Sequence, residues 1–152
     1  MGKRDLDKCI NVQMMKVMKL HRHVADNALN KLGLYAGQEV ILFKLWRHDG
    51  LTQSQLAEAL YVEPPTITKM VQRMEASGLL ERRPDVNDGR VSRVYLTDKG
   101  RALEQPVRDI WDQLETALTQ GLSDVELALM SRMLGQMGGN MQQVEESTIE
   151  NP

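Results

Sequence analysis

The stretch "LTQSQLAEALYVEPPTITKMVQRMEASGLL", residues 51–80, predicts two short helices joined by a turn. Thr52 can cap the first helix, and Gln55 can complete a capping box in which each side chain bonds the other residue's backbone N–H. Pro64 suits the first position of the second helix, because the N–H that proline lacks would be unpaired there. Gly78 stands where a left-handed residue ends a helix. The stretch therefore predicts a helix, a turn and a second helix.

The second of these helices has two contrasting faces. Its apolar positions recur at helical spacing and are expected to face a core; they are Ile67, Met70, Val71 and Met74. The opposite face is polar and rich in hydrogen-bond donors; its candidates for contact with a partner are Pro65, Thr66, Thr68, Lys69, Gln72 and Arg73. A short face of this kind can enter a groove of DNA, and an ordinary solvated face is the alternative.

The next stretch, "ERRPDVNDGRVSRV" over residues 81–94, predicts a β-hairpin with a basic tip. Strands are expected at about 79–83 and 91–97, because the second alternates Val94 and Leu96 with polar neighbours. The segment "PDVNDG" between them is rich in turn residues. Four arginines surround a tip that can bury little apolar surface: Arg82, Arg83, Arg90 and Arg93. They predict contact with a polyanion, and the alternative is a solvated hairpin whose arginines pair with its own aspartates.

Longer helices are predicted on both sides of this region, at about residues 6–31, 37–48 and 98–119, and after Ser123 to about residue 144. The helix at 37–48 is apolar on nearly every face, which indicates that it is buried. Thr97 is expected to cap the helix at 98–119 and Gly121 to end it. Ser123 and Glu126 repeat the capping box. The last residues, "EESTIENP", are expected to form a frayed tail.

Composition excludes several classes of protein. The chain has 152 residues and a net charge of −2, and it shows neither an apolar run long enough to span a membrane nor a secretory signal. A single cysteine excludes an intramolecular disulfide, so we expect a cytoplasmic protein. Charge is uneven along the chain, because residues 66–93 carry six bases and four acids, whereas residues 102–152 carry two bases and nine acids. This polarity is expected if only the middle of the chain meets a polyanion.

The sequence predicts neither an enzyme nor a metal site. It contains no phosphate-binding glycine loop and no Gly-x-Ser-x-Gly nucleophile motif. The three histidines, His21, His23 and His48, lack the spacing of a metal site, because residues two apart on a helix point in different directions. We therefore expect no catalytic activity, no cofactor and no metal.

The order of elements is that of a winged helix-turn-helix, and residues 51–100 resemble the MarR family of bacterial transcriptional regulators. The matching features are "LTQSQLAEAL" before the turn, "TITKMVQRMEASGLL" as recognition helix, "RRPDVNDGR" as wing and "LTDKG" at the start of the next helix. The resemblance extends over about residues 6–144. It implies a mainly α fold with a small β-hairpin wing and a sequence-specific regulator of transcription, by family tendency a repressor.

The resemblance also implies a homodimer. Residues 1–35 and 98–146 would form the helical dimerisation region, and residues 36–97 the DNA-binding lobe, with the helix-turn-helix at about 52–77 and the wing at about 79–97. Residues 147–152 would form a tail. The apolar stripes of the terminal helices agree with this arrangement, because so short a chain has little else to cover them.

Each part of the lobe has an expected role on double-stranded DNA with an inverted-repeat operator. The wing matches the family pattern Asp-x-x-Asp-x-Arg at Asp85, Asp88 and Arg90, and Arg90 is expected in the minor groove, whose negative potential attracts arginine. Asp88 is expected to hold the guanidinium of Arg90. Positions nearer the phosphates are expected for four further residues: Arg83 and Arg93 on the strands, and Ser54 and Gln55 at the start of the first short helix.

Family members often bind small anionic aromatic ligands between the dimer core and the lobe, which implies release of a repressor by an effector. The candidates here are Lys19, Arg22, Tyr35 and Trp46. The chain departs from the family at Glu39, where an apolar or aromatic residue is common.

Two alternatives stay open. Some relatives sense organic peroxides with one reactive cysteine flanked by tyrosines, and Cys9 lies near the expected place. The tyrosine positions, however, hold Ala36 and Glu39. The other alternative is an interaction module that kept the fold and lost DNA binding.

Overall fold

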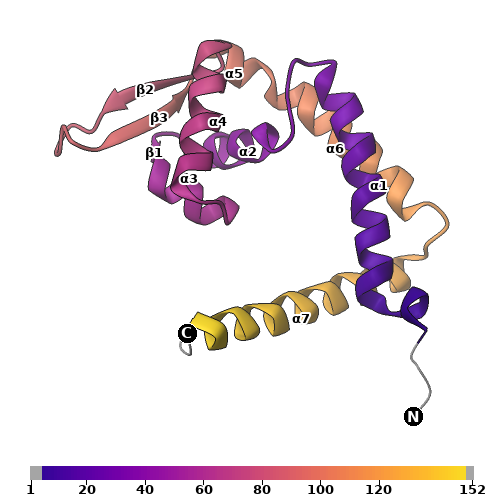
Figure 1. Cartoon of the computed structure of the whole chain (residues 1–152). Helices are drawn as coiled ribbons and strands as arrows, with labels where there is room; N and C mark the ends of the chain where they lie inside the picture. Colours follow the sequence, from indigo (N-terminus) through magenta and orange to yellow (C-terminus); the bar gives the residue numbers. More distant parts are fainter. Residues whose placement is uncertain (1–4, 150–152) are drawn as a thin grey trace. The chain divides into compact units, whose positions relative to one another are not determined.

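The computed structural model describes residues 5–149 and divides the chain into two compact units, Met1–Leu114 and Glu115–Pro152. The first unit begins with a short 3-10 helix, η1 (Leu6–Lys8), and continues through α1 (Ile10–Asn30) and α2 (Gln38–Arg47). The helix-turn-helix and the wing follow as β1 (Leu51–Thr52), α3 (Gln53–Leu60), α4 (Pro64–Ala76), β2 (Leu80–Pro84) and β3 (Ser92–Leu96) (Figure 1). Next come α5 (Asp98–Ala102), α6 (Glu104–Thr119), which crosses the division between the units, and α7 (Asp124–Ile149).

The predicted helix-turn-helix is confirmed in its local chemistry. Thr52 Oγ1 accepts a hydrogen bond from the Gln55 backbone N–H at 3.1 Å, and Gln55 Oε1 accepts one from the Thr52 N–H at 2.9 Å. Pro64 is the first residue of α4. Gly78 has a φ of +75°, and the Leu79 N–H reaches back to the carbonyl of Met74 at 2.9 Å, which is how a left-handed residue closes a helix.

The wing is confirmed as an antiparallel hairpin in which Leu80 pairs with Leu96 and Arg83 with Arg93. The sheet also has a third strand that the sequence analysis did not predict. β1 pairs with β3 through Leu51 and Val94, so the strand order is β1-β3-β2. Two residues are too few to show the alternation by which a strand is recognised.

Two predicted boundaries are wrong. The helix expected at 98–119 is interrupted at Leu103, because Pro106 has no N–H to bond the carbonyl of Ala102 and its ring would clash with that carbonyl. Pro106 is instead accommodated in the first turn of α6. The frayed tail is also wrong as far as residue 149, since α7 continues to Ile149; residues 150–152 lie outside the described part.

The core lies within the lobe and beneath α1. α4 is held there by its predicted apolar stripe, with Ile67, Val71 and Met74 buried and Met70 partly buried. The largest of the other fully buried apolar side chains come from five helices and strands and from the α1–α2 connection: Leu29, Leu34, Ile41, Leu42, Leu45, Leu56, Leu80 and Val94. The polar face of α4 is therefore turned outward.

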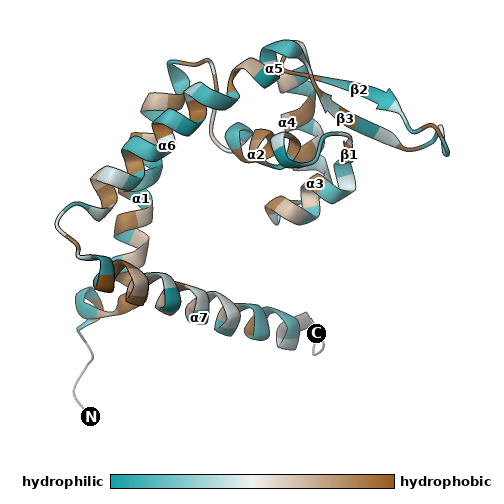
Figure 2. Ribbon diagram, turned by 180° about the vertical axis from the view of Figure 1, so that it is seen from behind, coloured by the Kyte–Doolittle hydropathy of each residue, from teal (hydrophilic) through white to brown (hydrophobic). Residues whose placement is uncertain are grey.

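Two helices leave large apolar side chains in solvent; Figure 2 colours the ribbon of both helices by the hydropathy of each residue. On α1 these are Ile10, Met14, Met15, Val17, Met18, Leu20 and Val24. On α7 they are Val125, Leu129, Met130, Met133, Leu134, Met141 and Val144. Over residues 5–149, no helix has the length and apolar character needed to cross a membrane.

Candidate nucleic-acid interface

The outward face of α4 carries exposed polar side chains. Pro65, Thr66, Lys69, Gln72 and Arg73 are all exposed. Within residues 5–149, neither Lys69 nor Arg73 forms an ion pair, so both cations are available to a partner.

Thr68 has a different environment from the rest of this face. It is half-buried, and its hydroxyl lies 3.0 Å from Gln53 Oε1 and 2.9 Å from the carbonyl oxygen of Pro64. The contact with Gln53 joins α4 to α3, so Thr68 contributes to the angle between the two helices.

The N-terminus of α3 presents Ser54 and Gln55, both exposed, at the place predicted for a phosphate contact. The carbonyl oxygen of the Gln55 side chain is used in the capping box, which leaves its NH₂ group free to donate. Unpaired backbone N–H groups at a helix N-terminus favour an anion.

The four arginines of the hairpin differ in how they are bound. Arg82 donates from Nε and Nη2 to Glu75 Oε2 on α4, at 3.0 and 2.7 Å. Arg83 pairs with Glu81 and lies over the ring of Tyr95, with 4.8 Å between the guanidinium carbon and the ring centroid. Arg82 and Arg83 therefore stabilise the first strand.

Arg93 ties the second strand to the rest of the lobe. Its Nε pairs with Asp85, and its Nη1 donates to the carbonyl of Gly50 at 2.9 Å. In the described part of the chain, Arg90 is the arginine of this hairpin whose guanidinium has no ion-pair partner.

The turn at the wing tip is organised by two aspartates. Asp85 Oδ1 accepts from the backbone N–H groups of Asn87 and Asp88, at 2.8 and 3.1 Å. Asp88 Oδ1 accepts from the backbone N–H of Arg90 at 3.0 Å. The expected pairing of Asp88 with the guanidinium of Arg90 is therefore wrong, because the Asp88 carboxylate is directed at the backbone and shapes the turn.

These contacts lower the pKa of Asp85 to about 2. The hydrogen bond from Arg93 is the main cause, and the bonds from the N–H groups of Asn87 and Asp88 add to it, since each favours the charged carboxylate. The carboxylate therefore stays ionised throughout the physiological pH range. The clamp that it forms, which consists of its pair with Arg93 and its hydrogen bonds to the turn, stays in place over the same range.

Asp49 and Gly50, which directly follow the helix expected at 37–48, have a role that the sequence pattern did not predict. Asp49 accepts from the backbone N–H of Leu96 at 3.0 Å and pairs with Arg101 at 2.7 Å. Gly50 has a φ of +77°, and a Cβ there would lie 2.7 Å from the ring of Tyr95. An Asp-Gly pair is the turn signal that could have pointed to this close approach.

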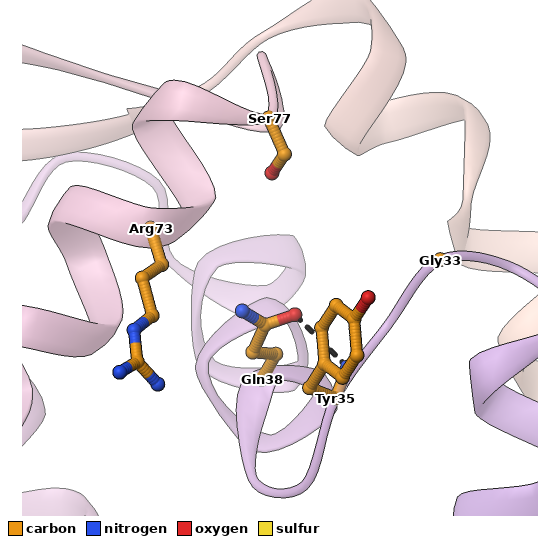
Figure 3. Close-up of a pocket in the computed structure, with 5 residues that line it drawn as sticks. All are labelled: Gly33, Tyr35, Gln38, Arg73 and Ser77. Carbon is orange, nitrogen blue, oxygen red and sulfur yellow. Dashed lines mark hydrogen bonds between the residues drawn. The ribbon is translucent and has the colours of Figure 1, made fainter.

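A cavity of about 320 Å³ lies between the α1–α2 connection and the end of α4. Gly33, Tyr35, Gln38, Arg73 and Ser77 line it (Figure 3). Gln38 is held in place because its Oε1 accepts from the Tyr35 backbone N–H at 3.0 Å. The cavity therefore offers an aromatic ring and a cation.

Of the four predicted effector residues, Tyr35 lines this cavity and the other three lie elsewhere. Lys19 is exposed on α1. The Trp46 indole N–H donates to the Gly100 carbonyl at 3.1 Å, and its ring packs against Phe43.

Arg22 is bound to two carboxylates. It donates to Glu39 Oε1 at 2.7 Å and pairs with Asp26, and these bonds, the one to Glu39 first, raise the pKa of Arg22. The Glu39 side chain is fully buried, and its second oxygen, Oε2, has no hydrogen-bond partner in the described structure. The pair joins α1 to α2.

Cys9 lies at the start of α1, half-buried, with its sulfur 3.7 Å from the carbonyl oxygen of Asp5. Among residues 5–149, no group of three or more His, Cys, Asp or Glu side chains is arranged to hold a metal ion.

Comparison with known proteins finds similarity to one family. Residues 34–92 match the MarR family model. The chain is 37% identical over 82 residues to the organic hydroperoxide resistance transcriptional regulator of Bacillus subtilis (strain 168), covering 54% of this chain and 56% of that protein. It is 37% identical over 67 residues to the HTH-type transcriptional regulator TtmR of Methylorubrum extorquens (strain PA1), covering 44% of this chain and 34% of that protein. The chain thus matches about half or less of the length of these two relatives.

Solved structures extend the likeness to most of the chain. The apo form of wild-type MarR from E. coli superimposes with a TM-score of 0.73 at 26% identity, over 85% of this chain and 96% of that one. A putative MarR-family transcriptional regulator from Listeria monocytogenes, complexed with 26mer DNA, gives a TM-score of 0.83 at 17% identity, over 95% and 96%. The chain is therefore similar to the MarR family by sequence over residues 34–92, and it shares the fold of these structures over most of its length.

Proposed function

We propose that this protein is a sequence-specific DNA-binding regulator of transcription that acts in the cytoplasm as a homodimer. The observation that carries the proposal is that three cations of the helix-turn-helix and wing have no ion-pair partner in the described structure: Lys69 and Arg73 on the exposed face of α4, and Arg90 at the wing tip. Helix α4 would enter the major groove and Arg90 the adjacent minor groove.

The homodimer accounts for the exposed apolar side chains of α1 and α7. Contiguous apolar surface of this kind marks an interface in most proteins. Two copies related by a twofold axis would place two α4 helices in successive major grooves, so the operator would be an inverted repeat with half-sites about 10 bp apart.

The test is a gel shift with the DNA upstream of the protein's own gene. We expect a discrete complex that unlabelled operator displaces and that unrelated competitor DNA does not. We expect Lys69→Glu to abolish this complex. Lys31→Glu, which makes the same charge change at an exposed position beyond the apolar residues of α1, is the control and should bind normally. Failure of the wild-type protein to shift any fragment would support an interaction module of the same fold instead.

We infer that the effector is an anionic aromatic molecule bound in the cavity between Tyr35 and Arg73. Its ring would pack on Tyr35 and its carboxylate would pair with Arg73, which belongs to α4. A ligand that engages Arg73 removes a cation from the DNA-binding face, which would release a repressor. Phenolic acids should raise the melting temperature of the wild-type protein, and Tyr35→Ala should bind DNA but lose the response.

A second candidate is peroxide sensing through Cys9, favoured by the name of the Bacillus subtilis relative. The tyrosines expected around such a cysteine are absent from positions 36 and 39. We therefore expect Cys9→Ser to leave both operator affinity and the response to cumene hydroperoxide unchanged. Release of the wild-type protein by the peroxide, with an unresponsive Cys9→Ser variant, would establish the sensor.

A further inference from the structure

Val86 is the most exposed of the large apolar side chains in the described part of the chain. It lies in the turn between β2 and β3, and its side chain is 97% exposed. A single exposed valine needs no explanation by itself. The surroundings of Val86 are more informative, because its position is fixed on both sides.

The turn holds Val86 through the carboxylates of its neighbours. Asp85 accepts from the N–H groups of Asn87 and Asp88, and Asp88 accepts from the N–H of Arg90. The N–H of Asp85 bonds the carbonyl of Val91 at 2.8 Å, and the N–H of Val91 bonds the carbonyl of Asp88 at 2.9 Å. Both carboxylates are thereby engaged by the backbone, and the exposed side chains at the tip include those of Val86 and Arg90.

We propose that Val86 is a specificity-determining residue that makes the wing prefer A·T pairs in the minor groove it enters. This inference rests on the proposed DNA binding. In the minor groove, A·T and T·A pairs display only acceptors, whereas a G·C pair adds the N2 amino group of guanine as a donor. Arg90 supplies donors for the acceptors. Val86 supplies no acceptor, so it leaves the guanine amino group unpaired and in contact with a methyl group.

A hydrogen-bond donor that is buried without a partner costs binding free energy. This cost sets how much weaker a G·C operator should bind than an A·T operator. The lost hydrogen bond to water corresponds to about a tenfold loss of affinity when G·C replaces A·T at the flanking positions. A-tracts also narrow the groove and strengthen its negative potential, which favours Arg90. The test must therefore separate the amino group from groove shape.

Inosine tests the amino group, because an I·C pair keeps the major-groove groups of G·C and lacks the N2 amino group; comparing variants at position 86 on the same operators separates this group from groove shape. Operators would carry A·T, I·C or G·C at the outer minor-groove steps that hydroxyl-radical footprinting shows to be protected. We expect the wild-type dimer to bind A·T and I·C operators alike and the G·C operator about tenfold more weakly. Equal affinity for I·C and G·C operators would overturn the proposal.

Two variants at position 86 complete the test. Val86→Thr keeps the shape and adds a hydroxyl that can accept from the guanine amino group, so it should bind the G·C and I·C operators with about equal affinity. Val86→Ala is the control, because it stays apolar and should keep the preference. A Val86→Thr variant that still discriminates tenfold between the G·C and I·C operators would contradict the inference.

The wild-type protein distinguishes failure of the proposed function from failure of the inference. If it binds none of the three operators, the proposed function fails; if it binds all three equally, only the role of Val86 fails.

Discussion

Arg93 Nη1 donates a hydrogen bond to the carbonyl oxygen of Gly50 at 2.9 Å, which joins the second strand of the wing to the connection that follows α2. The same guanidinium pairs with Asp85 at the start of the turn. One side chain thus connects the wing tip, the sheet and the end of α2. The contact of Arg93 with DNA that the sequence suggested stays a prediction, and this arrangement indicates a positioning role beside it.

Arg93→Ala should weaken operator binding by loosening the wing, with little change in how affinity depends on salt. A lost phosphate contact, by contrast, would lower the slope of log affinity against log salt by about 0.9 for each contact. Asp85→Ala should cause a similar loss, and the double variant should lose no more than either alone, because the two residues act as a unit. Additive losses together with a lower slope would show that Arg93 contacts DNA directly.

The pKa of Asp85 offers a second check on the clamp. Because its folded pKa, about 2, lies below the value for a free aspartate, the stability it contributes is present above pH about 4 and is lost as the pH falls toward 2. An NMR titration of the Asp85 carboxyl carbon should therefore show no transition between pH 8 and 4. In Arg93→Ala the transition should move up toward the ordinary value; a midpoint near 4 in the wild-type protein would disprove the pairing.

The buried contact between Arg22 and Glu39 should matter for stability. Arg22→Met leaves the buried carboxylate of Glu39 without its partner, and breaking such a pair costs about 3 kcal/mol. This figure is the low end of the cost for breaking buried pairs, and we expect it because the Arg22 side chain is itself 37% exposed. The double variant Arg22→Met with Glu39→Leu should recover much of the lost free energy of unfolding, as measured by urea denaturation. Equal stability of Arg22→Met and the wild-type protein would mean that Glu39 finds another partner.

The apolar stripe on α7 predicts that single charges there will weaken the dimer. Leu134→Glu would place a carboxylate in the interface and remove a leucine whose burial is worth about 2 kcal/mol in each subunit. Sedimentation equilibrium should show a dimer for the wild-type chain at micromolar concentration and a shift toward monomer for the variant. Gln142→Glu adds the same charge away from the stripe and should stay dimeric. A wild-type chain that sediments as a stable monomer would refute the dimer.

The sequence predicted the helix-turn-helix well because its signals are local. A capping box, a proline at the first helical position and a glycine after the last turn each act within a few residues, and all three occur as expected at Thr52, Pro64 and Gly78. The interruption at Leu103 was also accessible, since Pro106 lies four residues beyond the last carbonyl of α5.

The pairing of the arginines could not be predicted, because it depends on contacts between elements. Glu75 reaches Arg82 from α4 to β2, and Gly50 meets Arg93 across the sheet. Sequence alone placed Arg90 in the minor groove and Arg83 and Arg93 nearer the phosphates, and it did not show that Arg82, Arg83 and Arg93 have partners within the lobe. The structure distinguishes three that stabilise the wing from Arg90, which has no ion-pair partner among the described residues.

That distinction gives the most direct test, which is fluorescence anisotropy on the natural operator across a salt series. Arg90→Ala should lose about 1–3 kcal/mol of binding free energy for each wing. The salt slope should fall by about two units, because the proposed dimer would have two wings. Asp88→Ala should weaken binding less, since it disturbs the turn without removing a cation, and Glu145→Ala on α7 is the control. If Arg90→Ala binds with the affinity and salt slope of the wild-type protein, the hairpin is a solvated loop and the proposed minor-groove contact is wrong.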